Sequence, residues 1–154
     1  MSTTWTLARK QKFAKYLSSH VVLRLERHLA QMEELNASLA NESKSSAGDK
    51  YETSREMINQ QINQIAQQIN VTRSIQNLLP KIDFGPKEFL EPGAIFKADG
   101  KYFCWSVSLG KVTFDGEALF CISSQSPFAQ TCLNKKTGDE VGIGQNTFLV
   151  DWIV

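Results

Sequence analysis

Long hydrophobic runs are missing from this sequence, because no stretch approaches the roughly 20 apolar residues that a membrane-spanning helix requires. The basic stretch Met1–Tyr16 lacks the apolar segment and cleavage site of a signal peptide, so we expect neither export nor a membrane partner. Cysteine is also scarce, and Cys104, Cys121 and Cys132 are odd in number and far apart. A disulfide framework is therefore not expected, and a reducing cytoplasm is the expected location.

An excess of charge of either sign is lacking as well. The 17 Lys and Arg residues nearly balance the 16 Asp and Glu residues, and a net charge of +1 gives no reason to expect duplex DNA as a general partner. The histidines, His20 and His28, are two helical turns apart, too far for one metal ion. Neither lies near a cysteine, so Cys–His catalysis is not expected, and the cysteines are expected to be buried thiols.

Glycine and proline are absent from about Leu7 to Asn41, which predicts one long helix. Phe13, Leu17 and Val21 step by four and are expected to anchor the start of this helix. Six later residues step by three and four and predict a seam against another helix: Val22, Leu25, Leu29, Met32, Asn36 and Leu39. Asn36 is the polar member of this seam, and we expect it to fix the register of the helix pair.

A second stretch without glycine or proline runs from about Tyr51 to Leu79. Isoleucines step by four and three along it: Ile58, Ile62, Ile65 and Ile69. The residues around them are mostly Gln and Asn, which predicts a solvated helix with one buried stripe. Because only the small, polar residues 41–50 separate the two helices, the sequence predicts an antiparallel helical hairpin. Arms of roughly 30 residues, at a rise of ~1.5 Å each, would make it about 45 Å long.

The pattern changes after Pro80, which ends the second helix. Three parts are expected: a hairpin over 1–80 with its tip at 41–52, a linker over 81–92 and a small domain over 93–154. Short aromatic and β-branched segments between turns predict strands: Ala94–Ala98, Tyr102–Val107, Leu119–Ser123 and Thr147–Val154. Ser126 and Pro127 are typical of the start of a short helix that reaches Leu133. We therefore expect an α+β chain with a small antiparallel sheet.

An acidic element lies where the two predicted helices meet, with the sequence Gly48-Asp49-Lys50-Tyr51-Glu52. Asp49 and Glu52 are three positions apart at a helix start, so they lie on one face of the helix. Carboxylate oxygens are the ligands that Mg²⁺ prefers. The same spacing is typical of a capping box, in which Asp49 would accept a hydrogen bond from the amide near Glu52. The element predicts either a metal-binding pair or a helix cap.

Together with a C-terminal segment, this element resembles the Gre family of bacterial transcript-cleavage factors. The segment reads Ser126-Pro127-Phe128-Ala129-Gln130-Thr131-Cys132-Leu133-Asn134-Lys135-Lys136-Thr137-Gly138-Asp139-Glu140-Val141. The family carries a similar segment, which opens on Ser-Pro and ends on Gly-Asp-x-Val, and a closing strand follows it in both. The two elements occur in the family's order, and the resemblance spans nearly the whole chain.

The resemblance implies a transcription elongation factor with an FKBP-like C-terminal domain. Its partners would be RNA polymerase and the 3′ end of the nascent RNA. The hairpin would enter the secondary channel of the polymerase, where Asp49 and Glu52 would help to hold a second magnesium ion while the polymerase hydrolyses backtracked RNA. The chain would thus be a monomeric accessory factor without its own enzymatic activity or cofactor. Ser126, Pro127 and Phe128 are implied to dock on the channel rim.

Several alternatives stay open. After Glu52 the chain reads Thr53-Ser54-Arg55-Glu56, where the family usually continues Asn-Ala-Glu-Tyr, so a channel-binding regulator without cleavage activity is the nearest alternative. A free-standing FKBP-like binding module with a coiled-coil arm is another. Phe128 is either a docking anchor or a residue that packs the short helix onto the sheet. The basic residues of the first helix form either a solvated face or a contact with polymerase or RNA: Arg9, Lys10, Lys12 and Lys15.

Overall fold

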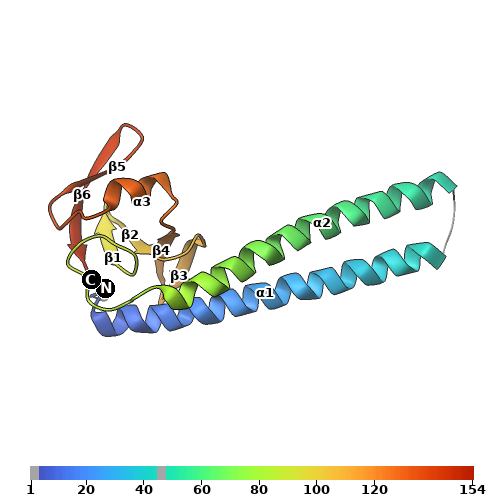
Figure 1. The fold of residues 1–154 in the computed structure, drawn as a ribbon, viewed down its shortest axis with the longest axis horizontal. Helices are drawn as coiled ribbons and strands as arrows, with labels where there is room; N and C mark the ends of the chain where they lie inside the picture. The colour runs from blue at the N-terminus through green and yellow to red at the C-terminus, as the bar shows by residue number, and fades with distance from the viewer. Residues whose placement is uncertain (1–3, 45–47) are drawn as a thin grey trace. The chain divides into compact units, whose positions relative to one another are not determined.

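The computed structural model describes residues 4–44 and 48–154, apart from the side chains at 42–44, 48–51 and 143 (Figure 1). The chain divides into two compact units. Ser19–Asn77 forms a helical unit, and Met1–Ser18 joins Leu78–Val154 in a β-rich unit. The α+β class expected from the sequence is confirmed. The boundary differs from the one expected near Pro80, because the first turns of the first helix belong to the β-rich unit.

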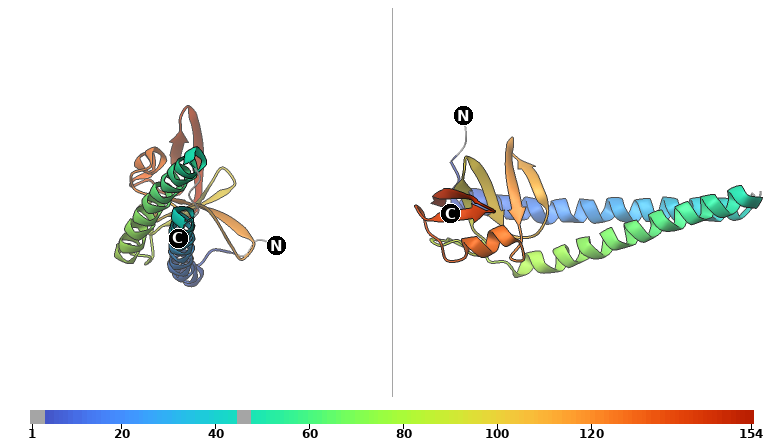
Figure 2. Two further views of the ribbon diagram at one scale, coloured as in Figure 1. Left: turned by 90° about the vertical axis from the view of Figure 1, so that its right-hand side faces the viewer. Right: turned by 90° about the horizontal axis from the view of Figure 1, so that it is seen from above.

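Two long helices, α1 (Leu7–Lys44) and α2 (Gly48–Leu78), account for the helical unit. Within this unit they run in opposite directions, as the expected hairpin requires (Figures 1 and 2). They lie side by side, since one shallow hollow is lined by Leu35 of α1 and Ile65 of α2. The break expected over 41–50 is shorter, because α1 continues to Lys44 and α2 begins at Gly48. Residues 45–47 of that break lie outside the described part of the chain.

The inward face of α1 differs from the expected seam at three of its six positions. Val22, Leu29 and Asn36 are exposed, so Asn36 does not fix the register from within a seam. Leu25, Met32 and Leu39 of the expected seam are half-buried, and Val21, His28 and Leu35 are the inward residues in place of the other three. The inward residues step by four from Phe13 to Leu25 and then by three and four to Leu39, so a single stripe follows the helix from its first turns. On α2 the isoleucine stripe is confirmed, since its members are half-buried or, at Ile69, buried.

The β-rich unit contains a six-stranded sheet in the order β3-β4-β2-β1-β6-β5. Its elements follow the short 3₁₀ helix η1 (Leu79–Lys81) along the chain as β1 (Ile95–Ala98), β2 (Lys101–Trp105), β3 (Gly110–Phe114), β4 (Glu117–Ile122), α3 (Pro127–Cys132), β5 (Glu140–Ile143) and β6 (Asn146–Ile153). Because β2 and β4 pair in parallel, the sheet is mixed rather than antiparallel throughout. The short strands β3 and β5 were not expected, and each contains a glycine, which weakens the strand pattern.

One face of the sheet packs against α3 around three phenylalanines, with ring centroids 5.2 Å apart for Phe96 and Phe103 and 5.0 Å apart for Phe103 and Phe128. The three cysteines are free and buried, as expected. Ser126 occupies the N-cap position of α3, and Pro127 lies at its start, although no side chain makes the capping hydrogen bond. Among the described residues, no helix combines the length and apolar character needed to cross a membrane.

The first turns of α1 belong to the β-rich unit because their aromatic rings pack against the β3–β4 hairpin. The ring centroids of Phe13 and Phe114 are 5.3 Å apart, and those of Trp5 and Phe114 are 6.3 Å apart. The indole of Trp5 donates a hydrogen bond of 2.9 Å to Glu117, and the guanidinium of Arg9 lies 4.1 Å from the centre of the Trp5 ring. Arg9 also pairs with Glu117 at 3.6 Å, so this cluster holds the helix start against β4.

Candidate functional site

The acidic element of the predicted tip lies at the start of α2. The helix includes Gly48, which places Asp49 inside the helix rather than at the N-cap position that a capping box would require. The side chain of Glu52 is exposed. The side chain of Asp49 lies outside the described residues, although its backbone belongs to α2. Both acids thus belong to a helix N-terminus, where the helix dipole favours negative charge.

In the segment predicted to dock on a partner, Ser126–Phe128, the aromatic residue is buried. Phe128 is only 8% exposed and packs between Phe96 and Phe103, so the prediction that it anchors a docking surface is wrong. Its burial follows from its position in the first turn of α3, on the side that faces the sheet. Pro127 is exposed, and Ser126 is half-buried. Leu133, an apolar residue directly after α3, is 54% exposed.

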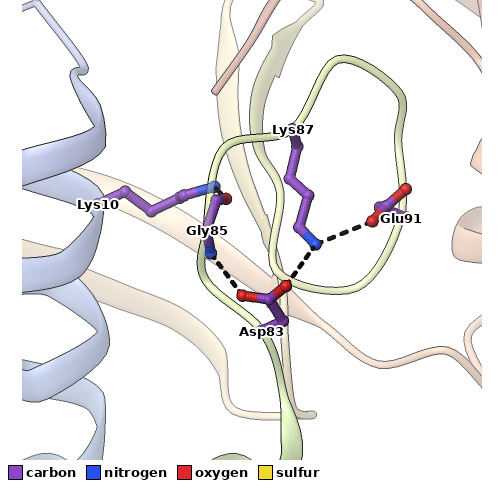
Figure 3. A network of polar contacts seen from close by, with 5 residues as sticks. All are labelled: Lys10, Asp83, Gly85, Lys87 and Glu91. Atoms are coloured by element: carbon purple, nitrogen blue, oxygen red, sulfur yellow. Dashed lines mark hydrogen bonds and ion pairs between the residues drawn. The ribbon is translucent and has the colours of Figure 1, made fainter.

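Two of the basic residues at the start of α1 are buried, against both expectations for that run. The side chain of Lys10 is fully buried, and its ammonium group donates a hydrogen bond of 2.6 Å to the carbonyl oxygen of Gly85 (Figure 3). Arg9 is buried against Trp5, whereas Lys12 and Lys15 are exposed. Lys10 therefore ties the helix start to the segment that follows η1, and it is not part of a solvated face.

This contact belongs to a set of four charged residues and one glycine, which we call the linker network: Lys10, Asp83, Gly85, Lys87 and Glu91 (Figure 3). Lys87 donates a hydrogen bond of 2.8 Å to Glu91 and lies 3.6 Å from a carboxylate oxygen of Asp83. Asp83 accepts a hydrogen bond of 2.9 Å from the amide of Gly85. Each carboxylate in the network thus has a cation or an amide beside it, and the network fixes the course of the linker.

The charges in the linker network shift one another's pKa values. Burial, reinforced by the nearby ammonium group of Lys87, lowers the pKa of Lys10 to about 8. The hydrogen bond to Glu91 raises the pKa of Lys87 above its ordinary value. The hydrogen bond from the Gly85 amide and the charge of Lys87 lower the pKa of Asp83. At neutral pH all three groups are charged, which is the arrangement of a structural clamp.

The cysteines are poorly suited to nucleophilic chemistry. A hydrogen bond with Cys104, together with burial, raises the pKa of the Cys121 thiol, and the two cysteines are paired in register across β2 and β4. Burial raises the pKa of Cys132 to about 11. The predicted burial of the three thiols is confirmed. The pKa shifts support a structural role, because a thiol that stays protonated at neutral pH is a weak nucleophile.

The two histidines lie along one basic hollow on α1. The hollow has a volume of about 310 Å³ and is lined by His20, Arg24, Arg27, His28 and Gln31. Burial and the charges of Arg24 and Arg27 lower the pKa of His20, so this histidine is neutral at pH 7. Across residues 4–44 and 48–154, no group of three or more His, Cys, Asp or Glu side chains is arranged to hold a metal ion.

Comparison with known proteins finds a likeness in structure but none in sequence. No protein-family profile matches the sequence, and no curated protein sequence matches it. The solved structure of the transcription factor Gfh1 is similar in fold to this chain, with 20% sequence identity and a TM-score of 0.37. The likeness covers 88% of this chain and 92% of the other. A fold likeness of this degree does not establish a shared function, because one fold serves many functions.

Proposed function

We propose that this chain is a Gre-like transcription factor that enters the secondary channel of RNA polymerase and stimulates cleavage of backtracked RNA. The observation that carries the proposal is the position of the acidic element. Because α2 begins at Gly48, Asp49 and Glu52 are the second and fifth residues of that helix, close to where the chain passes between α1 and α2. The resemblance of Ser126–Val141 to the family's C-terminal segment supports the proposal from a second part of the sequence.

The helical unit has the dimensions that this function needs. α2 is 31 residues long, which at ~1.5 Å per residue corresponds to about 45 Å. A hairpin of this length is long enough to present the turn between its helices inside a channel of another protein. The acids also lie near a helix N-terminus, where the helix dipole interacts favourably with negative charge.

The acidic pair supplies the kind of ligand that a magnesium ion needs, but too few ligands to hold the ion alone. Carboxylate oxygens are hard ligands of the kind that Mg²⁺ prefers, but near-octahedral coordination needs more ligands than Asp49 and Glu52 supply. In our proposal the polymerase, the RNA and water complete the coordination. An ion held in this way activates water and stabilises the transition state of phosphodiester hydrolysis. The contribution of this chain is to place the two carboxylates.

We further propose that the segment around α3 docks on the polymerase. Phe128 is excluded from this role by its burial, but Pro127 and Leu133 flank the helix and are both exposed. An exposed apolar side chain is a suitable anchor for an interface. Pro127 keeps the role that the resemblance implied, and Leu133 replaces Phe128.

A channel-binding regulator without cleavage activity is the second candidate. The observation that favours it is the sequence after Glu52, where Thr53, Ser54 and Arg55 replace the residues usual in the family. A basic residue one turn after the acids would lower their net charge and weaken their hold on a cation. The two candidates share the partner and the docking surface, and they differ only in what the acidic pair does.

A cleavage assay on a stalled, backtracked elongation complex distinguishes these possibilities. We expect the wild-type chain to stimulate cleavage and the double variant Asp49→Asn, Glu52→Gln to lose this stimulation while still binding polymerase. The matched control is Glu56→Gln, an exposed acid one turn further along α2, which should behave as wild type. In a pull-down, Pro127→Ala should retain less polymerase than wild type.

The outcomes have distinct meanings. Full stimulation by the double variant would refute the metal-binding role of the acids. Binding to polymerase without stimulation by the wild-type chain would favour the regulator. A failure of the wild-type chain to retain polymerase would refute both candidates and would favour a free-standing binding module.

A further inference from the structure

A row of three side chains crosses the middle of the sheet on the face opposite α3. Lys97 of β1 is paired in register with Tyr102 of β2 on one side and with Trp152 of β6 on the other. Residues directly opposite one another on neighbouring strands project from the same face of a sheet. The ring centroids of Tyr102 and Trp152 are 5.9 Å apart, and the ammonium group of Lys97 lies 5.8 Å from the centre of the Tyr102 ring.

A β-bulge in β6 places Trp152 in this row. Ala98 pairs with Val150, but the preceding residue of β1, Lys97, pairs with Trp152. Asp151 is therefore the extra residue of the bulge. Val150 belongs to the core that packs against α3, and strict alternation would have sent Trp152 to the same core. After the bulge, Ile153 packs against that core instead. Bulges often re-aim a side chain beside a functional site.

The row lines a hollow of about 460 Å³ within the β-rich unit. Trp5 forms a further wall, together with Thr4, Ile153 and Val154. The Trp5 ring is fixed by its hydrogen bond to Glu117 and by the guanidinium of Arg9 above it. Tyr102, Trp152 and Lys97 are each half-buried, so they remain partly accessible. The hollow thus offers rigid aromatic surfaces and one cation, and its volume lies within the range of small-molecule sites.

We propose that this hollow binds a nucleotide, with the base against the rings of Tyr102 and Trp152 and a phosphate at Lys97. Aromatic faces are the usual stacking surfaces for bases, and a Lys beside them supplies the contact with phosphate. Among residues 4–44 and 48–154, no carboxylate forms an ion pair with Lys97, so its charge is available to an anion. The proposal concerns the β-rich unit and does not depend on the role of the acidic element.

The position of the row within the sheet argues against a peptide that adds to the sheet as a further strand. A peptide that adds to a sheet needs a strand edge with free backbone groups. β1 is paired with both β2 and β6, and these strands are themselves paired on their outer sides with β4 and β5. The floor of the hollow therefore offers side chains alone, and stacking on these side chains does not require a free edge.

The experiment is a titration of the full chain with three probes: adenosine, AMP and a single-stranded oligoadenylate of ten nucleotides. Isothermal calorimetry gives the affinity, and the indole N–H signals of Trp5 and Trp152 in NMR spectra report the place of binding. We expect AMP and the oligonucleotide to bind saturably and adenosine to bind more weakly. Similar affinities for AMP and the oligonucleotide would identify a free nucleotide as the ligand, whereas a much tighter oligonucleotide would identify a single strand.

Two substitutions separate stacking from charge. Trp152→Ala should weaken binding of both phosphate-bearing probes by about tenfold or more, as expected when a stacked base loses its aromatic partner. Lys97→Gln should bring AMP to the affinity of adenosine. For the oligonucleotide we expect the logarithm of affinity to fall with the logarithm of salt concentration with a slope of about −0.7, as for one phosphate contact, and this slope should approach zero in Lys97→Gln. Lys97→Gln leaves both aromatic rings in place, so it tests the site even if Trp152→Ala disturbs the fold.

Matched controls come from exposed residues elsewhere in the same unit. Phe89→Ala removes a 46% exposed ring, and Lys111→Gln removes an exposed lysine of β3, so both should bind as wild type. The proposal is overturned if no probe saturates, or if Trp152→Ala and Lys97→Gln both bind as tightly as wild type. It is also overturned if Lys111→Gln weakens binding as much as Lys97→Gln, since the charge contact would then be diffuse.

Discussion

Replacement of Lys10 by Met should change how the stability of the β-rich unit depends on pH. Lys10 is fully buried, and its pKa is lowered from 10.5 to about 8, first by burial and then by the charge of Lys87. Asp83, Glu91 and Cys104 act in the opposite direction without cancelling this effect. The folded protein therefore releases the Lys10 proton at a lower pH than the unfolded chain does.

The sign and size of the effect follow from this difference. Below about pH 8 both the folded and the unfolded state hold the Lys10 proton, so Lys10 adds no pH dependence to the stability. In this range the buried charge lowers the free energy of unfolding by its full amount. Between about pH 8 and 10.5 the unfolded chain holds more protons, so the free energy of unfolding rises with pH. At 1.36 kcal/mol for each pKa unit, the whole gain is about 3 kcal/mol. The neutral amine can still donate to Gly85, so the hydrogen bond survives deprotonation.

Urea unfolding followed by tryptophan fluorescence measures this dependence, because Trp5, Trp105 and Trp152 all lie in the β-rich unit. From pH 7 to pH 10, the wild-type protein should gain about 2 to 3 kcal/mol relative to Lys10→Met. The other titrating groups are common to both proteins and largely cancel in the difference. Lys12→Met, at an exposed position of the same helix, should track the wild type. A flat difference, or a wild-type protein that loses stability relative to Lys10→Met, would refute the reasoning.

Two further predictions concern single side chains and backbone positions. Thr72 is fully buried, and its hydroxyl has no hydrogen-bond partner among the described residues. Thr72→Val keeps the shape of the side chain and removes the unpaired hydroxyl, so the free energy of unfolding should rise by about 1 kcal/mol. A lower free energy of unfolding, measured by thermal or urea denaturation, would contradict this prediction. Gly93 and Gly100 both have positive φ. A Cβ at Gly93 would lie 1.8 Å from the carbonyl oxygen of Asp83, whereas a Cβ at Gly100 would have no described atom within 4 Å. Gly100→Ala should lower the free energy of unfolding by about 1 kcal/mol through backbone strain alone, and Gly93→Ala should lower it by at least about 2 kcal/mol more. Equal losses of stability in urea or thermal denaturation would show that the collision at Gly93 is relieved.

The helices could be predicted from the sequence because their signals are local and repeated. The absence of glycine and proline and the stepping of the isoleucines are properties of consecutive residues, and they gave the hairpin correctly. Half of the predicted seam of α1 was wrong because two apolar series overlap there, one through Val22 and Leu29 and the other through Val21 and Leu35. Only contact with the neighbouring elements selects between such series.

The details of the sheet depended on contacts between distant residues, which a single sequence does not display. The parallel pairing of β2 with β4 brings Cys104 beside Cys121, and no local pattern distinguishes it from an antiparallel pairing. The bulge at Asp151 places Trp152 on the face of the sheet opposite the core, whereas strict alternation along β6 would have assigned this ring to the core. The aromatic hollow was missed for this reason. The acidic element of the predicted tip, in contrast, was visible because its two acids are close in sequence.

Polar residues at inward positions of the helices show where local reasoning stops. The stripe of α1 that contains Phe13 extends back by three residues to Lys10, and its continuation contains His28; the stripe of α2 contains Thr72. Spacing alone would therefore have placed these three residues inward, against the usual exposure of lysine. What spacing cannot supply is the partner. Lys10 finds a carbonyl oxygen 75 positions away, at Gly85, whereas the hydroxyl of Thr72 and Nε2 of His28 have no hydrogen-bond partner in the part of the chain that the structure describes. The helical period thus identifies the polar groups whose burial needs an explanation, and the linker supplies that explanation only for Lys10.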